Sequence, residues 1–222
     1  RAEFSNTISG EKVKPGDTII GLASGGRTKF EREDNSGIMC NGITLARHCL
    51  MGSRYNSDYP ETSDPNFKGY HGRFAFDDYV DELGMEVGEA ILSPTRVFLP
   101  VVAKILEKNG ADVAGLVHNT GGGQTKCLRI GNNIFYRKFD LIEPNPIFRL
   151  IQSEAKVSWR EMFEDFNMGT GFEIVARPEG VESILGIIEK FGLEAKVIGK
   201  CDKSRGGNKL VLESKFGKFA YG

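Results

Sequence analysis

The run His118-Asn-Thr-Gly-Gly-Gly-Gln-Thr holds the residues whose types and spacing point most directly to chemistry. Three consecutive glycines let backbone N–H groups come close to an anion, and a loop between a strand and a helix start holds phosphate in this way. The run matches neither the Walker A spacing nor the Gly-x-Gly-x-x-Gly motif. Residues 120–125 therefore predict a phosphate-binding loop, and a plain tight connection stays open as the alternative.

His118 stands directly before this loop, and its imidazole has two interpretations. At the mouth of a pocket, a histidine serves as a general acid or as a hydrogen-bonding group, because its pKa lies near neutral pH. A partly buried histidine also ties a loop to a strand without any catalytic role. Both interpretations stay open, and His118 is the candidate catalytic residue.

A second set of small polar residues follows the first expected strand. Ser24-Gly25-Gly26 ends that strand, and Asn41-Gly42-Ile-Thr44 begins a helix, whose N-terminal dipole favours negative charge. These residues predict a second contact with a ligand phosphate. Ordinary capping of the helix by Asn41 is the alternative.

Arg96 follows Ser93-Pro-Thr, one turn into an expected helix. A guanidinium binds a phosphate or a carboxylate through two parallel hydrogen bonds, so Arg96 is a third candidate for ligand binding. A salt bridge to a carboxylate of the chain itself is the alternative.

The spacing of cysteine and histidine argues against a metal site. Cys40, His48 and Cys49 lie close in sequence, but their spacing is not that of a zinc site and no fourth ligand follows. Nor does a Gly-x-Ser-x-Gly run place a serine nucleophile. With Cys127 and Cys201, the four cysteines are widely spaced and contain no Cys-x-x-Cys pair, which is typical of reduced thiols and predicts a cytoplasmic location.

Composition limits the class of protein. The chain has 222 residues, of which 40% are hydrophobic and 27% charged, and its net charge is -1. That length holds one large domain or two small ones, with enough apolar residues for a core. A nearly neutral chain whose apolar runs stay below the roughly 18 residues of a membrane span predicts neither nucleic acid nor membrane as a partner. The first residues, Arg-Ala-Glu-Phe-Ser, lack the features of a signal peptide and indicate a cut within a longer chain.

The elements that must position these residues begin with a strand and a helix. Val13 to Ser24 predicts a Pro-Gly turn and a buried strand, and Asn41 begins a helix with apolar residues at helical spacing. Residues 27–37 are rich in charge and predict an exposed excursion. Residues 52–75 are rich in turn formers and predict a surface insertion or lid.

A helix, a glycine, a strand and a glycine-rich loop then occur in that order twice. A helix from Pro94 to Asn109 precedes a buried strand at 112–118, and a helix at 181–191 precedes a strand at 193–198 and the loop at Arg205. This order suggests a duplicated α/β scaffold.

The segment between the copies and the tail complete the expected fold. A helix follows Pro144, Ser158 has the spacing of a capping box, and the loop at Phe166 leads into a strand. The tail at 209–214 predicts an edge or hairpin strand. The expected class is one α/β (α+β) domain, a mixed β-sheet flanked by helices with an exposed insertion.

Five of these motifs occur in the order found in one enzyme family. They are Val13 to Ser24, Asn41-Gly, Glu89-Ala-Ile-Leu-Ser-Pro-Thr-Arg, His118-Asn-Thr-Gly-Gly-Gly and Phe166-Asn-Met-Gly-Thr-Gly. Together they resemble the C-terminal half of aminoimidazole ribonucleotide (AIR) synthetases, the phosphoribosylformylglycinamidine cyclo-ligases. The resemblance implies a PurM-like C-terminal domain over residues 13–222, with residues 1–12 as the end of a connection from an N-terminal half.

The resemblance also implies a two-domain enzyme of purine biosynthesis. Its N-terminal half would form a homodimer and hold ATP and Mg²⁺ through acidic residues. The family's reaction uses ATP to phosphorylate the formyl amide oxygen of formylglycinamidine ribonucleotide, after which the ring nitrogen attacks and phosphate leaves. The present chain would bind the phosphoribosyl substrate and would show no turnover by itself.

By the same resemblance, the helix from Asn41 and the loop at 120–125 hold ligand phosphate in the cleft between the halves. Many family members have His-Ser-Asn-Gly where this chain has Met39-Cys-Asn-Gly, so His71 and His118 are the candidates to replace that histidine. The residues assigned to substrate and phosphate binding are Ser24, Gly25, Asn41, Gly42, Thr44, Arg96, Thr120, Gly121, Gly122, Gly123, Gln124, Thr125, Asn167 and Gly169.

Two other functions stay open. A sibling enzyme, such as thiamine-monophosphate kinase or selenophosphate synthetase, shares the two-half design but lacks the combination of Ser-Pro-Thr-Arg and Phe-Asn-Met-Gly. A non-catalytic phosphate-binding module would keep the fold and the loop without the other half.

Overall fold

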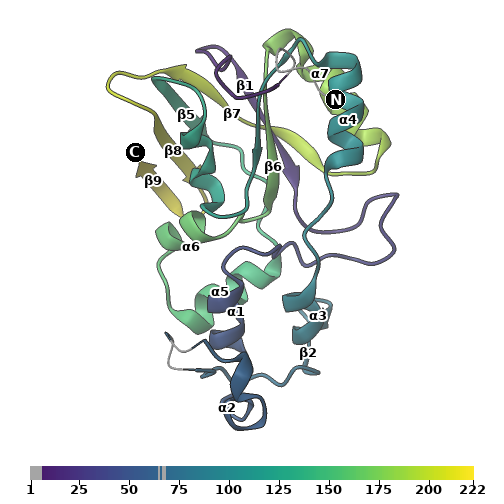
Figure 1. Cartoon of the computed structure of the whole chain (residues 1–222), viewed down its shortest axis with the longest axis vertical. Coiled ribbons are helices and arrows are strands. Elements are labelled where there is room, and N and C mark those ends of the chain that lie inside the picture. Colours follow the sequence, from purple (N-terminus) through teal and green to yellow (C-terminus); the bar gives the residue numbers. More distant parts are fainter. Residues whose placement is uncertain (1–6, 65, 67–68) are drawn as a thin grey trace.

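A seven-stranded mixed sheet forms the upper part of the molecule in the computed structural model, which describes residues 7–64, 66 and 69–222 (Figure 1). The strand order is β4-β6-β1-β7-β5-β8-β9, in which β5 and β8 are parallel and all other neighbours are antiparallel. The strands are β1 Thr18–Ala23, β4 Val113–His118, β5 Ile134–Lys138, β6 Thr170–Ala176, β7 Ala195–Lys203, β8 Lys209–Ser214 and β9 Gly217–Tyr221, and a small separate sheet joins β2 Tyr79–Val80 to β3 Met85–Glu86.

Helices lie beside this sheet and below it (Figure 1). They are α1 Ile43–Leu50, α2 Tyr55–Asp58, α3 Val87–Leu92, α4 Leu99–Asn109, α5 Pro146–Ala155, α6 Trp159–Asp165 and α7 Val181–Lys190, with 3-10 turns η2 Pro60–Thr62, η3 Gly123–Arg129 and η4 Pro178–Gly180. The predicted class, a mixed sheet flanked by helices, is confirmed.

The repeated helix and strand pattern belongs to a split βαβ arrangement. The units β1-α4-β4 and β6-α7-β7 interleave, so that their strands take the order β4-β6-β1-β7 and their helices pack against each other. Figure 1 shows α4 and α7 together on one side of β6 and β1. Apolar stripes on both helices, including the fully buried Val101, Ile105, Ile184 and Ile188, meet the sheet there. Each such side chain contributes about 1.5–3 kcal/mol by burial.

Residues 24–98 form one long insertion between β1 and α4, and they carry α1, α2 and α3 below the sheet (Figure 1). The segment at 52–75 is mostly exposed, as predicted, although Tyr70 and Phe74 are buried. The excursion at 27–37 is exposed in its middle, but the prediction is wrong at its end. Asn35 and Ser36 are buried there, because their side chains donate to the carbonyls of Pro94 and Ala90.

Several element boundaries differ from the predicted ones. Helix α4 begins at Leu99 with Pro100 in its first turn, and not at Pro94, since residues 93–98 form a non-helical segment. The helix cap before α1 is Gly42, with φ 70°, and not Asn41. The capping box of Ser158 with Glu161 is confirmed at the start of α6.

Three further points concern the ends and the surface. The connection expected at residues 1–12 lies partly outside the described residues, which begin at position 7. Within the described part, the structure contains no helix long and apolar enough to cross a membrane.

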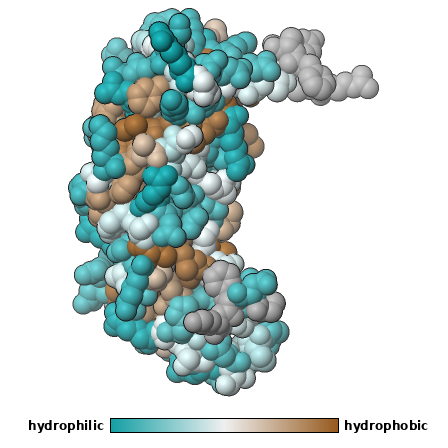
Figure 2. All heavy atoms as spheres, turned by 90° about the vertical axis from the view of Figure 1, so that its left-hand side faces the viewer, coloured by the Kyte–Doolittle hydropathy of each residue, from teal (hydrophilic) through white to brown (hydrophobic). Residues whose placement is uncertain are grey.

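Figure 2 shows a side of the molecule that is largely hydrophilic, with hydrophobic side chains gathered over the sheet and where the sheet meets the lower helices.

Candidate functional site

The glycine loop leaves β4 and turns directly into η3. Gly121, Gly122 and Gly123 all have left-handed backbone, with φ of 61°, 104° and 46°. In the part of the chain that the structure describes, the N–H groups of Gly122 and Gly123 have no hydrogen-bond partner. These two backbone donors are therefore not used within the described chain, and binding of an anion by the loop stays a prediction.

Gly122 and Gly123 differ in their surroundings. A Cβ on Gly122 would meet the side chains of Arg129, Lys126 and Thr125 at 3.8 Å, which is an ordinary contact distance, so a Cβ fits there without a clash. A Cβ on Gly123 would lie 2.4 Å from the carbonyl oxygen of Phe166, so this glycine permits the loop to pack on the end of α6. Gly122 therefore has room for a side chain, whereas Gly123 allows the loop to pack closely against the end of α6.

Two cations that the sequence analysis did not single out flank this loop. Lys126 and Arg129 are three residues apart in η3, and three residues per turn place them on one face of a 3-10 helix. Lys126 Nζ donates to the carbonyls of Thr120 and Gly121 at 2.8 and 3.1 Å. The Arg129 guanidinium lies 3.8 Å from where a Cβ of Gly122 would be. Their spacing after the glycines was the signal that could have found them.

His118 lies at the end of β4, where its ring contacts Phe98 and Phe172 with centroid distances of 5.7 Å each. Its Nε2 is buried, and no described residue bonds to it. Burial and the nearby charge of Lys126 lower the pKa of His118 below its usual 6.5, so the imidazole is neutral at pH 7. A neutral ring with an unpaired nitrogen is able to accept a proton.

Asn41 joins the helix α1 to the glycine loop. Its Oδ1 accepts the N–H of Gly121 at 2.8 Å, and its Nδ2 donates to the carbonyl of Asp165. The side chain therefore braces the loop against α6. Thr44 lies on the first turn of α1, where its carbonyl oxygen is 2.7 Å from Nδ1 of His48.

The inner part of the predicted site is buried scaffold beneath the loop. Gln124 is 1% exposed and donates to the carbonyl of Asn167. Asn167 in turn donates to the carbonyls of Gly37 and Ile38 and accepts the N–H of Gly169. Among the predicted residues, Thr125 closes the loop, since its Oγ1 donates to the Gly122 carbonyl at 2.7 Å.

Arg96 takes the alternative role that the sequence left open. Its guanidinium is buried and forms two hydrogen bonds to Glu31, at 2.8 and 2.9 Å. Its remaining donors bind the carbonyls of Ala23, Gly25 and Gly26 at 2.8–2.9 Å. All five N–H donors are used within the chain. Arg96 thus holds the segment after β1 in place through hydrogen bonds from the interior of the protein.

Ser24 and Gly25 belong to the same inner layer. The N–H of Ser24 donates to the carbonyl of Gly169, and its buried Oγ has no partner among the described residues. A Cβ on Gly25 would lie 2.2 Å from the side chain of Asn145. Ser24 thus connects the Arg96 segment to the residue before β6, and Gly25 lies against the residue before α5.

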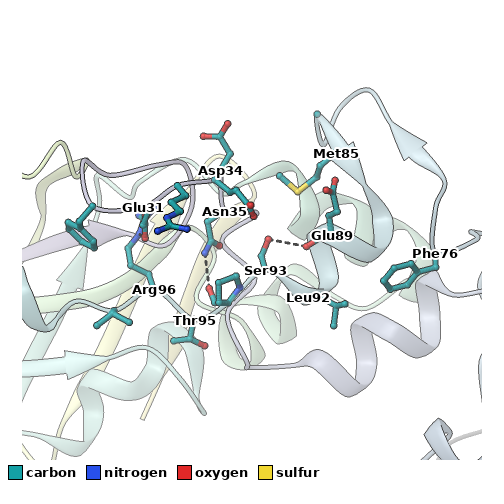
Figure 3. A pocket seen from close by; sticks show the side chains of 16 residues that line it. Glu31, Asp34, Asn35, Phe76, Met85, Glu89, Leu92, Ser93, Thr95 and Arg96 are labelled. Atoms are coloured by element: carbon teal, nitrogen blue, oxygen red, sulfur yellow. Dashed lines mark hydrogen bonds and ion pairs between the residues drawn. The ribbon is translucent and has the colours of Figure 1, made fainter.

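A cavity of about 870 Å³ lies beside the Arg96 segment (Figure 3). Figure 3 shows Glu31, Asp34 and Arg96 on one side of it and Met85, Glu89 and Phe76 on the other. Apolar side chains near it are unusually open to solvent, with Leu92, Val97 and Leu99 exposed by 68, 61 and 70%. The rim of the cavity is therefore apolar and open to solvent at Leu92 and Val97.

The predicted histidine candidates lie in different places. His71 is exposed in the insertion, where its N–H donates to the carbonyl of His48 on α1. Met39 is 2% exposed and packs beside Gly171, so the position that holds a histidine in many family members points into the core here. His118, in contrast, borders the glycine loop. Among residues 7–64, 66 and 69–222, no three His, Cys, Asp or Glu side chains are grouped as metal ligands.

Comparison with known sequences identifies relatives of the whole chain. A family model described as AIR synthase related protein, C-terminal domain, matches residues 14–210. The phosphoribosylformylglycinamidine cyclo-ligase of Methanothermobacter thermautotrophicus is 36% identical over 212 residues, which are 96% of this chain and 52% of the relative. That of Methanococcus maripaludis is 34% identical over 197 residues, 89% of this chain and 47% of the relative. The chain spans about half the length of the curated relatives it matches.

Solved structures share the fold at much lower identity. PurL of T. maritima, complexed with FGAR, has a TM-score of 0.51 and 13% identity, over 98% of this chain and 29% of that chain. Thiamine-monophosphate kinase from Stenotrophomonas maltophilia has a TM-score of 0.50 and 10% identity, over 94% of this chain and 54% of that chain. These likenesses concern the fold alone, and they confirm the expected PurM-like architecture.

Proposed function

The chain belongs to the family of AIR synthase related proteins, as their C-terminal domain, and from this membership we propose that it is the substrate-binding half of an ATP-dependent cyclo-ligase. The proposed reaction converts formylglycinamidine ribonucleotide to aminoimidazole ribonucleotide. Relatives that are 34 and 36% identical bear the name phosphoribosylformylglycinamidine cyclo-ligase, which supports this substrate.

One observation carries the proposal from the side of the structure. Gly122, whose N–H is unpaired, lies next to the cations Lys126 and Arg129, and the side chains of Asn41 and Lys126 bind the backbone of the loop. Backbone donors together with lysine and arginine are the groups that bind a phosphate ester. We assign this loop to the 5′-phosphate of the ribonucleotide.

His118 is the proposed catalytic residue. It precedes the loop by two residues, its imidazole is neutral at pH 7, and its Nε2 is unpaired among the described residues. A base at this point accepts the proton that the ring nitrogen loses when it attacks. The aromatic contacts with Phe98 and Phe172 fix the plane of the imidazole.

The second half of the enzyme is the proposed partner, and the exposed apolar residues support it. Leu92 and Val97 line the cavity of Figure 3, and Leu99 is exposed next to Phe98, a buried side chain that contacts His118. The exposed apolar side chains are the proposed contact surface. A half that covers it buries the apolar side chains and closes the site against water. The complete protein is proposed to be a cytoplasmic homodimer.

ATP and Mg²⁺ are proposed to bind mainly through that other half. A magnesium ion requires several oxygen ligands, and the described residues contain no cluster that supplies them. Residues 7–64, 66 and 69–222 therefore supply no such group of ligands by themselves. Their contribution is to bind and orient the phosphoribosyl substrate, which is a large part of catalysis in phosphoryl transfer.

Turnover by the complete polypeptide tests the proposal. The assay offers formylglycinamidine ribonucleotide and ATP, with thiamine monophosphate and selenide as comparison substrates, and measures aminoimidazole ribonucleotide. We expect product from the first substrate alone, and no turnover by the 222-residue chain in isolation. Turnover of a comparison substrate instead would assign the chain to a sibling enzyme, and failure on all three would favour a binding module.

A matched pair of variants then locates the phosphate site. We expect Arg129→Met to raise the KM for the ribonucleotide roughly tenfold, because one charged hydrogen bond to phosphate is lost. Arg205→Met is the control, since this exposed arginine also adjoins glycines but lies in the loop after β7. Equal effects of the two substitutions would contradict the assignment.

A further inference from the structure

A fully buried ion pair lies directly beneath the glycine loop. Lys138, the last residue of β5, and Glu173, in the middle of β6, have no exposed side-chain surface, and their charged atoms are 2.5 Å apart. The pattern of residues in the sequence did not single out either side chain. Neither of them reaches the solvent at the proposed phosphate site.

The pair binds both ends of the loop. At the beginning, Asn119 donates from Nδ2 to Glu173 Oε1 at 2.7 Å. At the end, Lys138 Nζ donates to the main-chain oxygen of Gln124 at 2.8 Å and to its side-chain oxygen at 3.1 Å. One carboxylate and one ammonium thus connect residues 119 and 124, which bracket the glycines.

The ammonium of Lys138 is charged in this setting. Burial opposes the charge, but Cys127 and Glu173 nearby raise the pKa of Lys138 above its usual value. Burial raises the pKa of the Cys127 thiol to about 12, and the Lys138 ammonium lies 2.5 Å from the carboxylate of Glu173. All three N–H donors of Lys138 are engaged, with Glu173 and twice with Gln124.

A buried pair of this kind is a poor way to stabilise a core. Two charges must leave water, and their replacement by apolar residues of similar volume is often neutral or stabilising. Glu173 Oε2 also has no partner within the described part of the chain. The bonds to the two loop ends are therefore the feature of the pair that an apolar core would not provide.

We infer that Lys138 and Glu173 are positioning residues, which hold the glycine loop in the shape that leaves the N–H groups of Gly122 and Gly123 unpaired. This deepens the proposed function, because that loop is the proposed phosphate site. The pair acts through Asn119 and Gln124 and does not touch the ligand.

The double variant Lys138→Met/Glu173→Met tests the inference in the 222-residue chain. Its readouts are amide chemical shifts and hydrogen exchange of Asn119, Gly121 and Thr125, whose N–H groups donate to Gly171, to the Asn41 side chain and to Gly122, together with the urea midpoint of unfolding. We expect an unfolding midpoint close to that of the wild type and loop exchange that is at least roughly tenfold faster. With ribose 5-phosphate as the probe, the affinity falls by a similar factor.

A second variant separates the two ends of the loop. Lys138→Met/Glu173→Gln keeps an acceptor for Asn119 and removes the bonds to Gln124. We expect faster exchange at Thr125 with little change at Asn119. The matched control is Arg137→Met/Asp202→Met, which removes the neighbouring and solvent-exposed ion pair of β5 and β7 and leaves the loop signals unchanged.

The outcomes decide the inference without reference to turnover. Unchanged amide chemical shifts and hydrogen exchange of the loop in both double variants would overturn the inference. Failure of both variants to fold would also overturn it, because the ion pair would then be needed for the stability of the core. Absence of ribose 5-phosphate binding by the wild type would count against the proposed function, while the exchange measurements would still decide the role of the pair.

Discussion

Two segments of this molecule have the composition of an anion site. One leaves some of its hydrogen-bond donors free, and the other binds all of its arginine donors within the chain. The glycine loop at 119–125 has free N–H groups at Gly122 and Gly123 and cations along its η3 face. The segment at 93–97 turns Arg96 inward, where one carboxylate and three carbonyls occupy all its donors. The difference shows that a motif identifies the groups available, while their neighbours decide which of them remain free for a ligand.

Arg96→Met is expected to have the largest effect in this comparison, and it acts on stability. The substitution leaves Glu31 and three carbonyl oxygens without their donors, and removal of one partner of a buried pair costs about 3–5 kcal/mol. Urea unfolding measures this loss. Arg129→Met is the counterpart in the loop, where an exposed side chain contributes within about 0.5 kcal/mol to stability. Similar losses in the two variants would remove the distinction between the segments.

The next largest effect separates the two glycines inside the loop. Gly123→Ala places a Cβ against the carbonyl oxygens of Phe166 and Phe163 and also strains a positive φ, which together cost about 2–4 kcal/mol. Gly122→Ala brings its Cβ only to ordinary contact distances of 3.8 Å and is expected to cost only about 1–2 kcal/mol from φ. Thermal unfolding of the two variants checks this order, and an inverted order would mean that the loop is seated differently.

Gly122→Val affects binding more than folding. Its branched side chain stands where a phosphate is proposed to reach the N–H groups, so affinity for ribose 5-phosphate falls at least roughly tenfold. The circular dichroism spectrum remains close to that of the wild type. Calorimetric titration measures the affinity, and an unchanged value would remove the loop from the proposed site.

The pH dependence of stability distinguishes the inward arginine from an exposed ion pair. Burial alone would raise the pKa of Glu31, but hydrogen bonds from Arg96 and the Thr28 backbone lower it below its usual 4.5. Its stabilisation is therefore present above pH 4.5 and is lost as the pH falls through the lowered pKa. Arg96→Met should weaken this dependence and leave the part that comes from Thr28. Lys104→Met, which frees the exposed Glu107, should change the acid limb only at low salt.

The smallest expected effect concerns His118. Burial and Lys126 lower its pKa, so the folded state favours the neutral ring and loses stability as the pH falls through the unfolded value of about 6.5. An NMR titration of the imidazole should give a midpoint below 6.5, and Lys126→Met should move it upward. A midpoint at or above 6.5 in the wild type would contradict the neutral base proposed here.

Interactions between residues close in sequence allowed much of the fold to be predicted from the sequence. Ser158 with Glu161 forms its own capping box, and the apolar stripes of α4 and α7 need only helical periodicity. The start of α4 was placed five residues too early, because Pro94 is compatible with a first helical turn and nothing local shows that Arg96 is held from β1. Strand β5 was missed, since its register depends on β7 and β8.

The sequence by itself determined which groups are present: a triple glycine after a strand, a repeated helix and strand order, and motifs specific enough to indicate the family. The tertiary structure alone decided how they are used. All hydrogen-bond donors of Arg96 are bound within the chain, because Glu31 and three carbonyl oxygens surround its guanidinium. Lys138 binds Gln124 because the end of β5 lies next to the start of η3. Such hydrogen bonds join residues that are 14 to 73 positions apart in the sequence. Contacts over these separations produce no periodic pattern of residue types, so the sequence alone does not reveal them.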